Sequence, residues 1–260
     1  RRFGLFILEA IKFDLKAGRL DVTTHPFCEG LGPGDTRLTT RYRDEKFTDA
    51  LYGTMHEAGH GLYEQGLPKL EGGAGVGSMF GQPLSEAISL GIHESQSRMW
   101  ENFVGRSREF WEWALPHAKK LLTGPGGERP LEKYGPDDLY RAVNTCTPSF
   151  IRVEADESTY NLHVMVRFEI ERAMMLGSIG VRDIPGVWNR MYKDYLGVDV
   201  PDDRRGCLQD VHWSFGLIGY FPTYTLGNLY AGQLWETINA QNPALKTQMK
   251  NGEFGPLREW

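Results

Sequence analysis

Two histidines four residues apart, with a glutamate directly after the first, limit most strongly what this chain can fold into. They are His56, Glu57 and His60, within residues 54–60. Four residues of an α-helix advance about 400°, so both imidazoles share one face, one turn apart, and can bind a single cation. Apolar residues recur at helical spacing around the motif, and Gly66 is a suitable helix end. The spacing therefore predicts a helix that carries two metal ligands.

The pattern His-Glu-x-x-His is typical of zinc sites in which the glutamate is a general base. In such a site Glu57 accepts a proton from water whose pKa the metal lowers, and the hydroxide attacks a carbonyl that the metal polarises. Glu57 then delivers the proton to the leaving amine. The predicted reaction is hydrolysis of a peptide bond. The alternative interpretation is a surface helix with two solvated histidines.

A catalytic zinc site needs a third protein ligand, and we expect it to be Glu94. This residue lies in the otherwise uncharged stretch 87–96, which has the composition of a buried segment. A buried carboxylate is costly unless it is paired or bound to a cation. The alternative ligands are other histidines: His93 first, and then His25, His117 and His163. Two imidazoles and a carboxylate suit zinc, and they also accept cobalt or manganese.

Peptide hydrolysis also needs a hydrogen-bond donor for the oxyanion, opposite the metal. The candidates are His212 and Tyr224, with Tyr220 as a second choice, in or beside the long uncharged run 213–235. Glycines and polar residues interrupt that run, which argues against a membrane span. The glycine-rich segment 72–83 is interpreted as a mobile loop beside a cleft.

Helical patterns predominate, so the predicted fold is mainly α with a small β-sheet. Strand character is clearest over residues 35–42, where an extended strand ahead of the metal helix could pair with a substrate backbone. Helices are expected over 1–17, 85–104, 107–122, 136–144, 156–176, 184–196 and 230–240.

Bulk properties exclude some classes of partner. The net charge is −5 and the basic residues form no long stripe, so a nucleic-acid partner is not expected. The three cysteines, Cys28, Cys146 and Cys207, are far apart and favour a reducing, cytoplasmic compartment. The chain begins at Arg1 without a methionine and ends at Trp260, and we expect it to be a fragment of a longer chain.

Five blocks of sequence resemble, in order, the M32 family of metallocarboxypeptidases. They are DTRLT at 35–39, HEAGH at 56–60, HESQ at 93–96, IRVEAD at 151–156 and GCLQDVHW at 206–213. The resemblance spans nearly the whole chain. It implies a zincin-like catalytic region with a deep groove, formed by a single catalytic domain over 1–260 that lacks the N-terminal helices and the C-terminal end of the family. It also implies a homodimer for the full-length protein.

The resemblance implies that His56, His60 and Glu94 bind zinc or cobalt, with Glu57 as the base. It further implies removal of single residues from peptide C-termini with broad specificity. The partner is then a peptide with a free terminal carboxylate, and neither nucleic acid nor a membrane is expected. The alternatives are an oligopeptide endopeptidase with the same zinc site, or a truncated, non-catalytic zinc-binding protein.

An exopeptidase must recognise a terminal carboxylate, which a guanidinium matches with two parallel hydrogen bonds. Arg152 is the first candidate and Arg37 the second. The alternative for Arg152 is an ion pair with Glu154 or Asp156. In some related zinc sites a carboxylate lies one turn after the third ligand, but that position is Arg98 here. The group that orients the metal histidines must therefore come from elsewhere, and Asp210 is one candidate.

Overall fold

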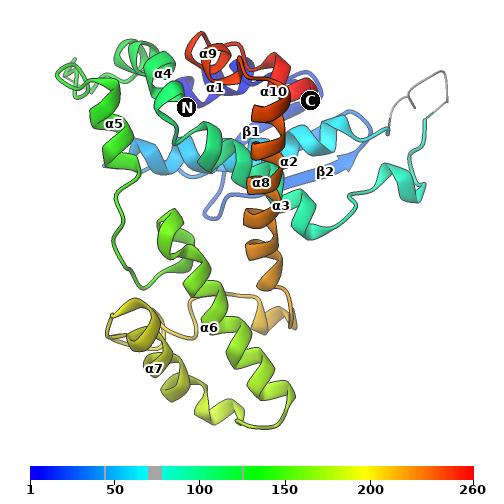
Figure 1. Ribbon diagram of the computed structural model, residues 1–260, viewed down its shortest axis with the longest axis vertical. Helices are drawn as coiled ribbons and strands as arrows, with labels where there is room; N and C mark the ends of the chain where they lie inside the picture. Colours follow the sequence, from blue (N-terminus) through cyan, green and yellow to red (C-terminus); the bar gives the residue numbers. More distant parts are fainter. Residues whose placement is uncertain (44, 70–77, 125) are drawn as a thin grey trace. The chain divides into compact units, whose positions relative to one another are not determined.

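The computed structural model describes residues 1–43, 45–69, 78–124 and 126–260 (Figure 1). They form two compact units, and each is described here by itself. Unit 1 comprises Arg1–Val143 and Gly227–Trp260, and unit 2 comprises Asn144–Leu226. Whether they act as the single catalytic domain expected from the sequence stays a prediction. Part of the glycine-rich segment 72–83 lies outside the described residues.

Unit 1 contains a three-stranded sheet in the order β1-β3-β2, made of β1 (Gly18–Val22), β2 (Cys28–Gly32) and β3 (Asp35–Thr40). β1 is parallel to β3, and β2 is antiparallel to it with an irregularity between Gly30 and Gly32. The predicted strand over 35–42 is thus present as β3, but it lies in the middle of the sheet. Its backbone already pairs on both sides, so the prediction that it adds a substrate strand is wrong.

Unit 1 is mainly helical, and its helix α2 (Phe47–Gly66) carries the His-Glu-x-x-His pattern (Figure 1). The others are α1 (Arg2–Ala10), α3 (Leu90–Arg98), α4 (Arg108–Leu121), α5 (Pro136–Val143), α9 (Leu245–Lys250), α10 (Gly255–Glu259) and, from Gly227, α8 (Pro222–Gln241). A short 3₁₀ helix, η2 (Pro83–Ser85), precedes α3, and a π-helix, η3 (Met99–Val104), follows it.

Close packing around α2 fixes where its ligands lie. Met55, Ala58 and Leu62 are buried in the same apolar core as Leu38 of β3. Burial of a large aliphatic side chain contributes about 1.5–3 kcal/mol, so this apolar stripe holds α2 in one rotational setting. Gly59 lies on α2 where α3 crosses it, and a Cβ there would lie 2.4 Å from the backbone oxygen of Gln96. A glycine is therefore required for the two helices to approach so closely.

Unit 2 is built on two packed helices, α6 (Glu157–Met175) and α7 (Ile184–Leu196). Val166 and Ile170 of α6 are buried against Trp188 and Tyr192 of α7. Short 3₁₀ helices are η4 (Arg152–Glu154), η5 (Val181–Asp183) and η6 (Trp213–Phe215), and the first residues of α8 also belong to this unit. Among the described residues, no helix combines the length and apolar character needed to cross a membrane.

Candidate metal centre

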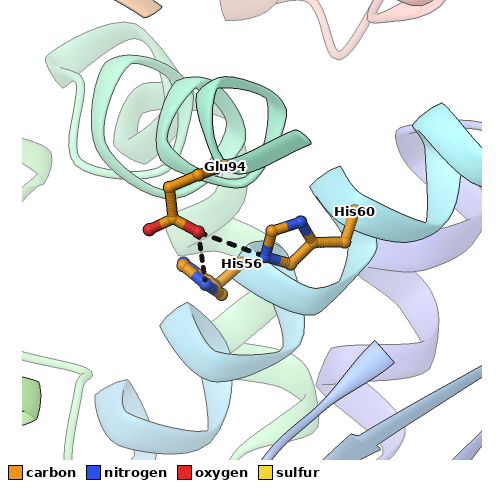
Figure 2. A group of neighbouring side chains, drawn as sticks. All are labelled: His56, His60 and Glu94. Carbon is orange, nitrogen blue, oxygen red and sulfur yellow. Dashed lines mark ion pairs between the residues drawn. The ribbon is translucent and has the colours of Figure 1, made fainter. Parts of the chain in front are cut away.

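The structure brings together the three predicted metal ligands. α2 presents His56 and His60 one turn apart, and α3 presents Glu94 opposite them (Figure 2). Oε2 of Glu94 lies 3.3 Å from Nε2 of His60 and 3.7 Å from Nε2 of His56. The ligand atoms of all three residues lie within 4.8 Å of one another. His56 and Glu94, which are 38 positions apart in the sequence, thus lie next to one another.

These separations fit a divalent cation. Zinc binds imidazole nitrogen and carboxylate oxygen at about 2.0–2.1 Å in tetrahedral geometry, which places neighbouring ligand atoms about 3.3 Å apart. The two measured nitrogen–oxygen distances, 3.3 and 3.7 Å, are close to that value. One imidazole lone pair on each histidine and one carboxylate oxygen form the donor set expected for a site with a fourth, open position.

Local structure fixes the position of Glu94. The side chain of Ser89 caps the start of α3 by accepting the backbone N–H of Ile92 at 3.1 Å. Ser97 donates its hydroxyl to Oε2 of Glu94 at 3.0 Å. Gly227 of α8 packs directly against Glu94, because a Cβ at Gly227 would lie 2.5 Å from its Cγ. A cap, a hydroxyl and a close helix contact therefore leave the carboxylate little freedom.

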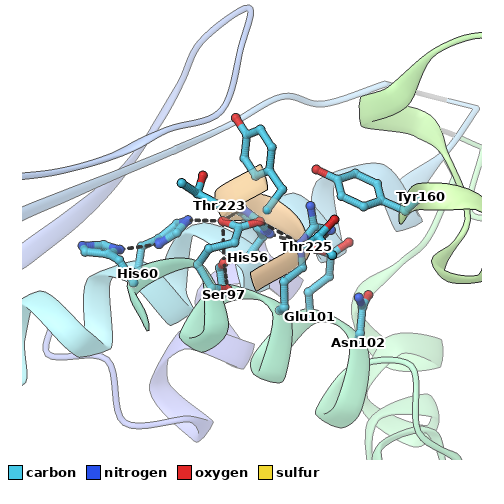
Figure 3. A network of polar contacts seen from close by, with 12 residues as sticks. His56, His60, Ser97, Glu101, Asn102, Tyr160, Thr223 and Thr225 are labelled. Carbon is cyan, nitrogen blue, oxygen red and sulfur yellow. Dashed lines mark hydrogen bonds and ion pairs between the residues drawn. The ribbon is translucent and has the colours of Figure 1, made fainter. Parts of the chain in front are cut away.

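A second layer of charged residues surrounds the ligands (Figure 3). Nδ1 of His56 lies 2.9 Å from Oε2 of Glu101, which lies in the π-helix η3. Arg98 donates to Oε1 of Glu94 at 2.7 Å and to Oε2 of Glu101 at 3.4 Å. Arg106 donates to Oε1 of Glu101 at 3.3 Å. Glu101 is the orienting carboxylate that sequence reasoning missed, and its signal was its position two helical turns after Glu94.

His60 has a different second layer. Its Nδ1 lies 2.6 Å from Nδ1 of His93, and Nε2 of His93 lies 2.8 Å from Oε1 of Glu64. Glu64 lies one turn after His60 on α2 and also pairs with Lys69. Both nitrogens of His93 are thus engaged with protein groups, and it does not belong to the converging ligand set.

Burial and charge set the protonation of Glu57, the predicted general base. Glu57 is 7% exposed. Burial raises the pKa of Glu57 to about 7, with the negative charges of Glu94 and Glu101 adding to the rise and His56 opposing it. A carboxyl group with a pKa near neutrality can both accept and return a proton at physiological pH. This property separates Glu57 from the neighbouring acids.

The pKa values of the neighbouring groups shift differently. Burial alone would raise the pKa of Glu94, but Arg98 and the two histidines outweigh it and lower that pKa. Burial would likewise raise the pKa of Glu101, yet His56, Arg98 and Arg106 lower it to about 2. Burial lowers the pKa of His60 to about 4. At His56, burial is outweighed by Glu94 and Glu101, which raise its pKa to about 9. The site thus favours anionic carboxylates next to a positive charge.

Comparison with known proteins identifies the family. Residues 1–260 match the family described as Carboxypeptidase Taq (M32) metallopeptidase. The chain belongs to this family. The resemblance seen in the five sequence blocks is therefore confirmed, and so is the mainly helical, zincin-like fold with a small sheet.

M32 relatives match this chain over its whole length. It is 50% identical over 260 residues to thermostable carboxypeptidase 1 of Thermus thermophilus and 43% identical to carboxypeptidase 1 of Bacillus subtilis. Those alignments cover all of this chain and 48% and 49% of the two relatives. The crystal structure of an M32 carboxypeptidase from Deinococcus radiodurans R1 superposes with a TM-score of 0.90 at 44% identity, covering 100% of this chain and 50% of that chain. The chain thus spans about half the length of the relatives it matches.

Arg152, the first candidate for carboxylate binding, lies in unit 2 of this M32 chain. Its Nε and Nη2 donate to Oδ1 of Asp210 at 3.1 and 2.8 Å, and its Nη1 donates to the hydroxyl of Tyr160 at 2.8 Å. The acid that pairs with it is therefore Asp210, and the alternative with Glu154 or Asp156 is wrong. The hypothesis that Asp210 orients the metal histidines is also not supported, since Glu101 and His93 contact them.

The other predicted residues fall in both units. In unit 2, Nε2 of His212 lies 2.9 Å from the hydroxyl of Tyr224. The ring of Tyr220 lies 5.2 Å from that of His212, between ring centres. In unit 1, Arg37 is exposed and pairs with Asp35 at 2.8 Å. The structure therefore unites His212 with Tyr224, whereas the roles of both and of Arg152 and Arg37 stay predictions.

Proposed function

We propose that this M32 chain carries the metal centre of a metal-dependent carboxypeptidase that releases single C-terminal amino acids from peptides with broad specificity. The observation that carries the proposal is the convergence of His56, His60 and Glu94 beside the buried base Glu57. Family membership supports the same conclusion. A structural zinc site normally has four protein ligands, whereas the part of the chain that the structure describes offers three here, beside a candidate base.

The donor set indicates how the cation would be held. His56 and His60 would bind it through Nε2 and Glu94 through Oε2, and zinc suits these donors, with cobalt or manganese as alternatives. Bound there, the cation would supply Lewis acidity, which lowers the pKa of water and polarises the scissile carbonyl. Arg98 donates to the other carboxylate oxygen of Glu94 and so keeps Oε2 directed at the two imidazoles.

The proton transfers fall to Glu57. Burial raises its pKa, which makes its carboxylate a stronger base for the proton of the attacking water. Once protonated, the same carboxyl group can return that proton to the amine that leaves. Burial favours both steps, because the neutral and ionised forms of Glu57 are then close in free energy at the working pH.

Substrate recognition would use residues of unit 2. Arg152 has five N–H groups, and three of them donate to Asp210 and Tyr160. A guanidinium can bind a carboxylate through two N–H groups, and two N–H groups of Arg152 are not used in these three bonds. The hydrogen-bonded pair of His212 and Tyr224 would supply a donor to the developing oxyanion.

The test replaces Glu57 with Gln and follows cleavage of a peptide with a free C-terminus. We expect activity to fall about 10²–10⁴-fold, because the amide cannot accept the proton. Metal content should be unchanged, since Glu57 is not in the ligand set. The matched control is Glu86→Gln, an exposed glutamate whose loss should leave activity as it is.

Two results would contradict the proposal. If Glu57→Gln retained wild-type activity, the base would lie elsewhere and the metal would be structural. If C-terminally amidated peptides were cut as fast as free acids, the activity would be that of an endopeptidase. If amidated peptides were cut at the full rate and Glu57→Gln lost activity, the metal-dependent mechanism would stand. Only the exopeptidase assignment would then be rejected.

A further inference from the structure

We propose that Glu101 and His93 are positioning residues that hold both metal-binding imidazoles with Nδ1 protonated and Nε2 directed at the cation. The inference deepens the proposed function and rests on its metal site. Two hydrogen bonds support it, each on the side of the imidazole that faces away from the metal site. His56 bonds to Glu101 of η3, and His60 bonds to His93 of α3.

The two rings have the same orientation toward Glu94. In both His56 and His60 it is Nε2 that faces Oε2 of Glu94 (Figure 2). Nδ1 of each ring therefore points away from the site, where a protein group can fix it. A neutral imidazole has one N–H and one lone pair, so protonation of Nδ1 leaves the lone pair on Nε2.

The ring of His56 is held by a carboxylate. Its Nδ1 lies 2.9 Å from Oε2 of Glu101, whose two carboxylate oxygens also receive N–H groups from Arg98 and Arg106. An ionised carboxylate held between two guanidinium groups only accepts hydrogen bonds. Nδ1 of His56 must therefore be the donor, and Glu101, which lies beside His56 in Figure 3, fixes both the ring plane and the tautomer.

At His60 the acid, Glu64, acts through a second ring, that of His93. Glu64 pairs with Lys69 and accepts from Nε2 of His93, so the proton of a neutral His93 is on Nε2. Nδ1 of His93 is then an acceptor, and it lies 2.6 Å from Nδ1 of His60. Nδ1 of His60 must therefore donate. The relay from Glu64 through His93 gives His60 the tautomer that Glu101 gives His56 directly.

The two arrangements differ in strength. Nδ1 of His56 contacts a carboxylate directly, whereas Nδ1 of His60 contacts an imidazole, and the carboxylate of Glu64 lies behind that ring. Hydrogen bonds to charged groups are roughly twice as strong as those between neutral groups. Loss of Glu101 should therefore cost more metal affinity than loss of His93.

The experiment measures zinc affinity by competition with a chromophoric chelator. We expect Glu101→Ala to weaken zinc binding about 10–100-fold, which is the usual cost of removing such a partner. Glu101→Gln should lose less, because its amide oxygen can still accept from Nδ1. His93→Phe keeps a ring of similar shape without the acceptor and should lie between Glu101→Gln and the controls. The controls are Glu86→Gln and Asp199→Asn, both at exposed positions.

A second measurement reports on the hydrogen bonds themselves. Nitrogen-15 NMR of the imidazoles should show slowly exchanging Nδ1–H protons on His56 and His60. Glu101→Ala should remove the signal of His56 alone, and His93→Phe that of His60 alone. General destabilisation would affect both signals in either variant, so the selective pattern is specific to positioning.

Failure of the inference and failure of the proposed function give different results. Affinities of Glu101→Ala and His93→Phe equal to those of the controls, or loss of both Nδ1–H signals together, would overturn the positioning roles. Absence of zinc binding by the wild-type protein would overturn the proposed function. In that case the NMR pattern of the metal-free protein still decides whether Glu101 and His93 hold the two rings.

Discussion

The metal centre of unit 1 and the guanidinium cluster of unit 2, made of Arg152, Arg167 and Asp210, both bury several charges, but they do so differently. In the guanidinium cluster each oxygen of Asp210 receives a donor: Oδ1 lies 2.8 Å from Nη2 of Arg152, and Oδ2 lies 2.6 Å from Arg167. In the metal centre, two imidazole nitrogens and a carboxylate oxygen, all able to act as ligands, converge on one another. Convergence of acceptors indicates a cation site, whereas matched donors and acceptors indicate an ion-pair network.

This contrast has an energetic consequence. Removing one member of a buried ion pair leaves an uncompensated charge in a poorly solvated place. The guanidinium cluster should therefore respond to substitution through folding stability. The metal centre should respond chiefly through cation affinity and chemistry, because its ligands have the cation as their common partner.

The largest expected effect on stability is that of Asp210→Asn, which leaves two buried guanidinium groups without their acid. We expect it to lower the free energy of unfolding by about 3–5 kcal/mol. Chemical denaturation with hydrogen exchange resolved along the chain would show the loss in unit 2. The control, Asp199→Asn, changes an exposed aspartate and should leave unfolding unaltered. Equal effects of the two substitutions would show that the guanidinium cluster is not structural.

Acid should act on unit 2 through His163, which is buried and contacts the hydroxyl of Tyr192 at 3.0 Å. Burial, together with Arg167 and Arg152, lowers the pKa of His163 to about 3. The unfolded chain takes up this proton near pH 6.5 and the folded chain only near 3, so stability falls as the pH falls between these values. Between pH 7 and pH 5 the loss is about 2 kcal/mol.

The measurement compares urea unfolding of the wild type and of His163→Gln at pH 7 and pH 5. Glutamine does not titrate, so the variant should lack the part of the acid sensitivity due to His163. If the two proteins lost the same stability over this range, His163 would be protonated equally in the folded and unfolded states. The acid sensitivity of unit 2 would then not be due to His163.

The smallest effects are expected at two helix caps, one in each unit. Ser89 caps α3, which carries Glu94, and Asp156 caps α6, which carries Arg167. Ser89→Ala and Asp156→Ala should each cost about 1 kcal/mol. Hydrogen exchange should place each loss in the first turn of its own helix. A loss that spread equally over both units would contradict their description as separate compact regions.

Local patterns predicted much of the secondary structure. The helix expected over 184–196 has those bounds in the structure, and those expected over 107–122, 136–144 and 156–176 differ by a residue at one or both ends. Local end signals explain part of this agreement, since Ser107 and Asp156 both accept from the first turn of their helices and Gly197, in the left-handed region, ends α7. Longer-range packing explains the failures. The opening helix ends at Ala10, before Lys12 with its positive φ, and η3 replaces the last turns expected of an α-helix over 85–104.

In the candidate site, too, local sequence patterns predicted some features and not others. The convergence of His56, His60 and Glu94 was predictable because spacing placed the two histidines on one face, and because an isolated acid in an apolar stretch needs a partner. Glu101 and the relay through His93 were not, because their roles depend on how α3 and η3 cross α2. Arg152 and Asp210 are 58 positions apart, so no local pattern connects them.

The most direct test of the metal site is X-ray absorption spectroscopy of the zinc-loaded protein, with Glu94→Gln as the comparison. We expect zinc at about 2.0–2.2 Å from two imidazole nitrogens and a carboxylate oxygen in the wild type. Glu94→Gln should lose the carboxylate oxygen and bind zinc more weakly than any of the positioning variants. A wild-type spectrum without two imidazole ligands, or one that Glu94→Gln leaves unchanged, would contradict the central claim that these residues form a metal site.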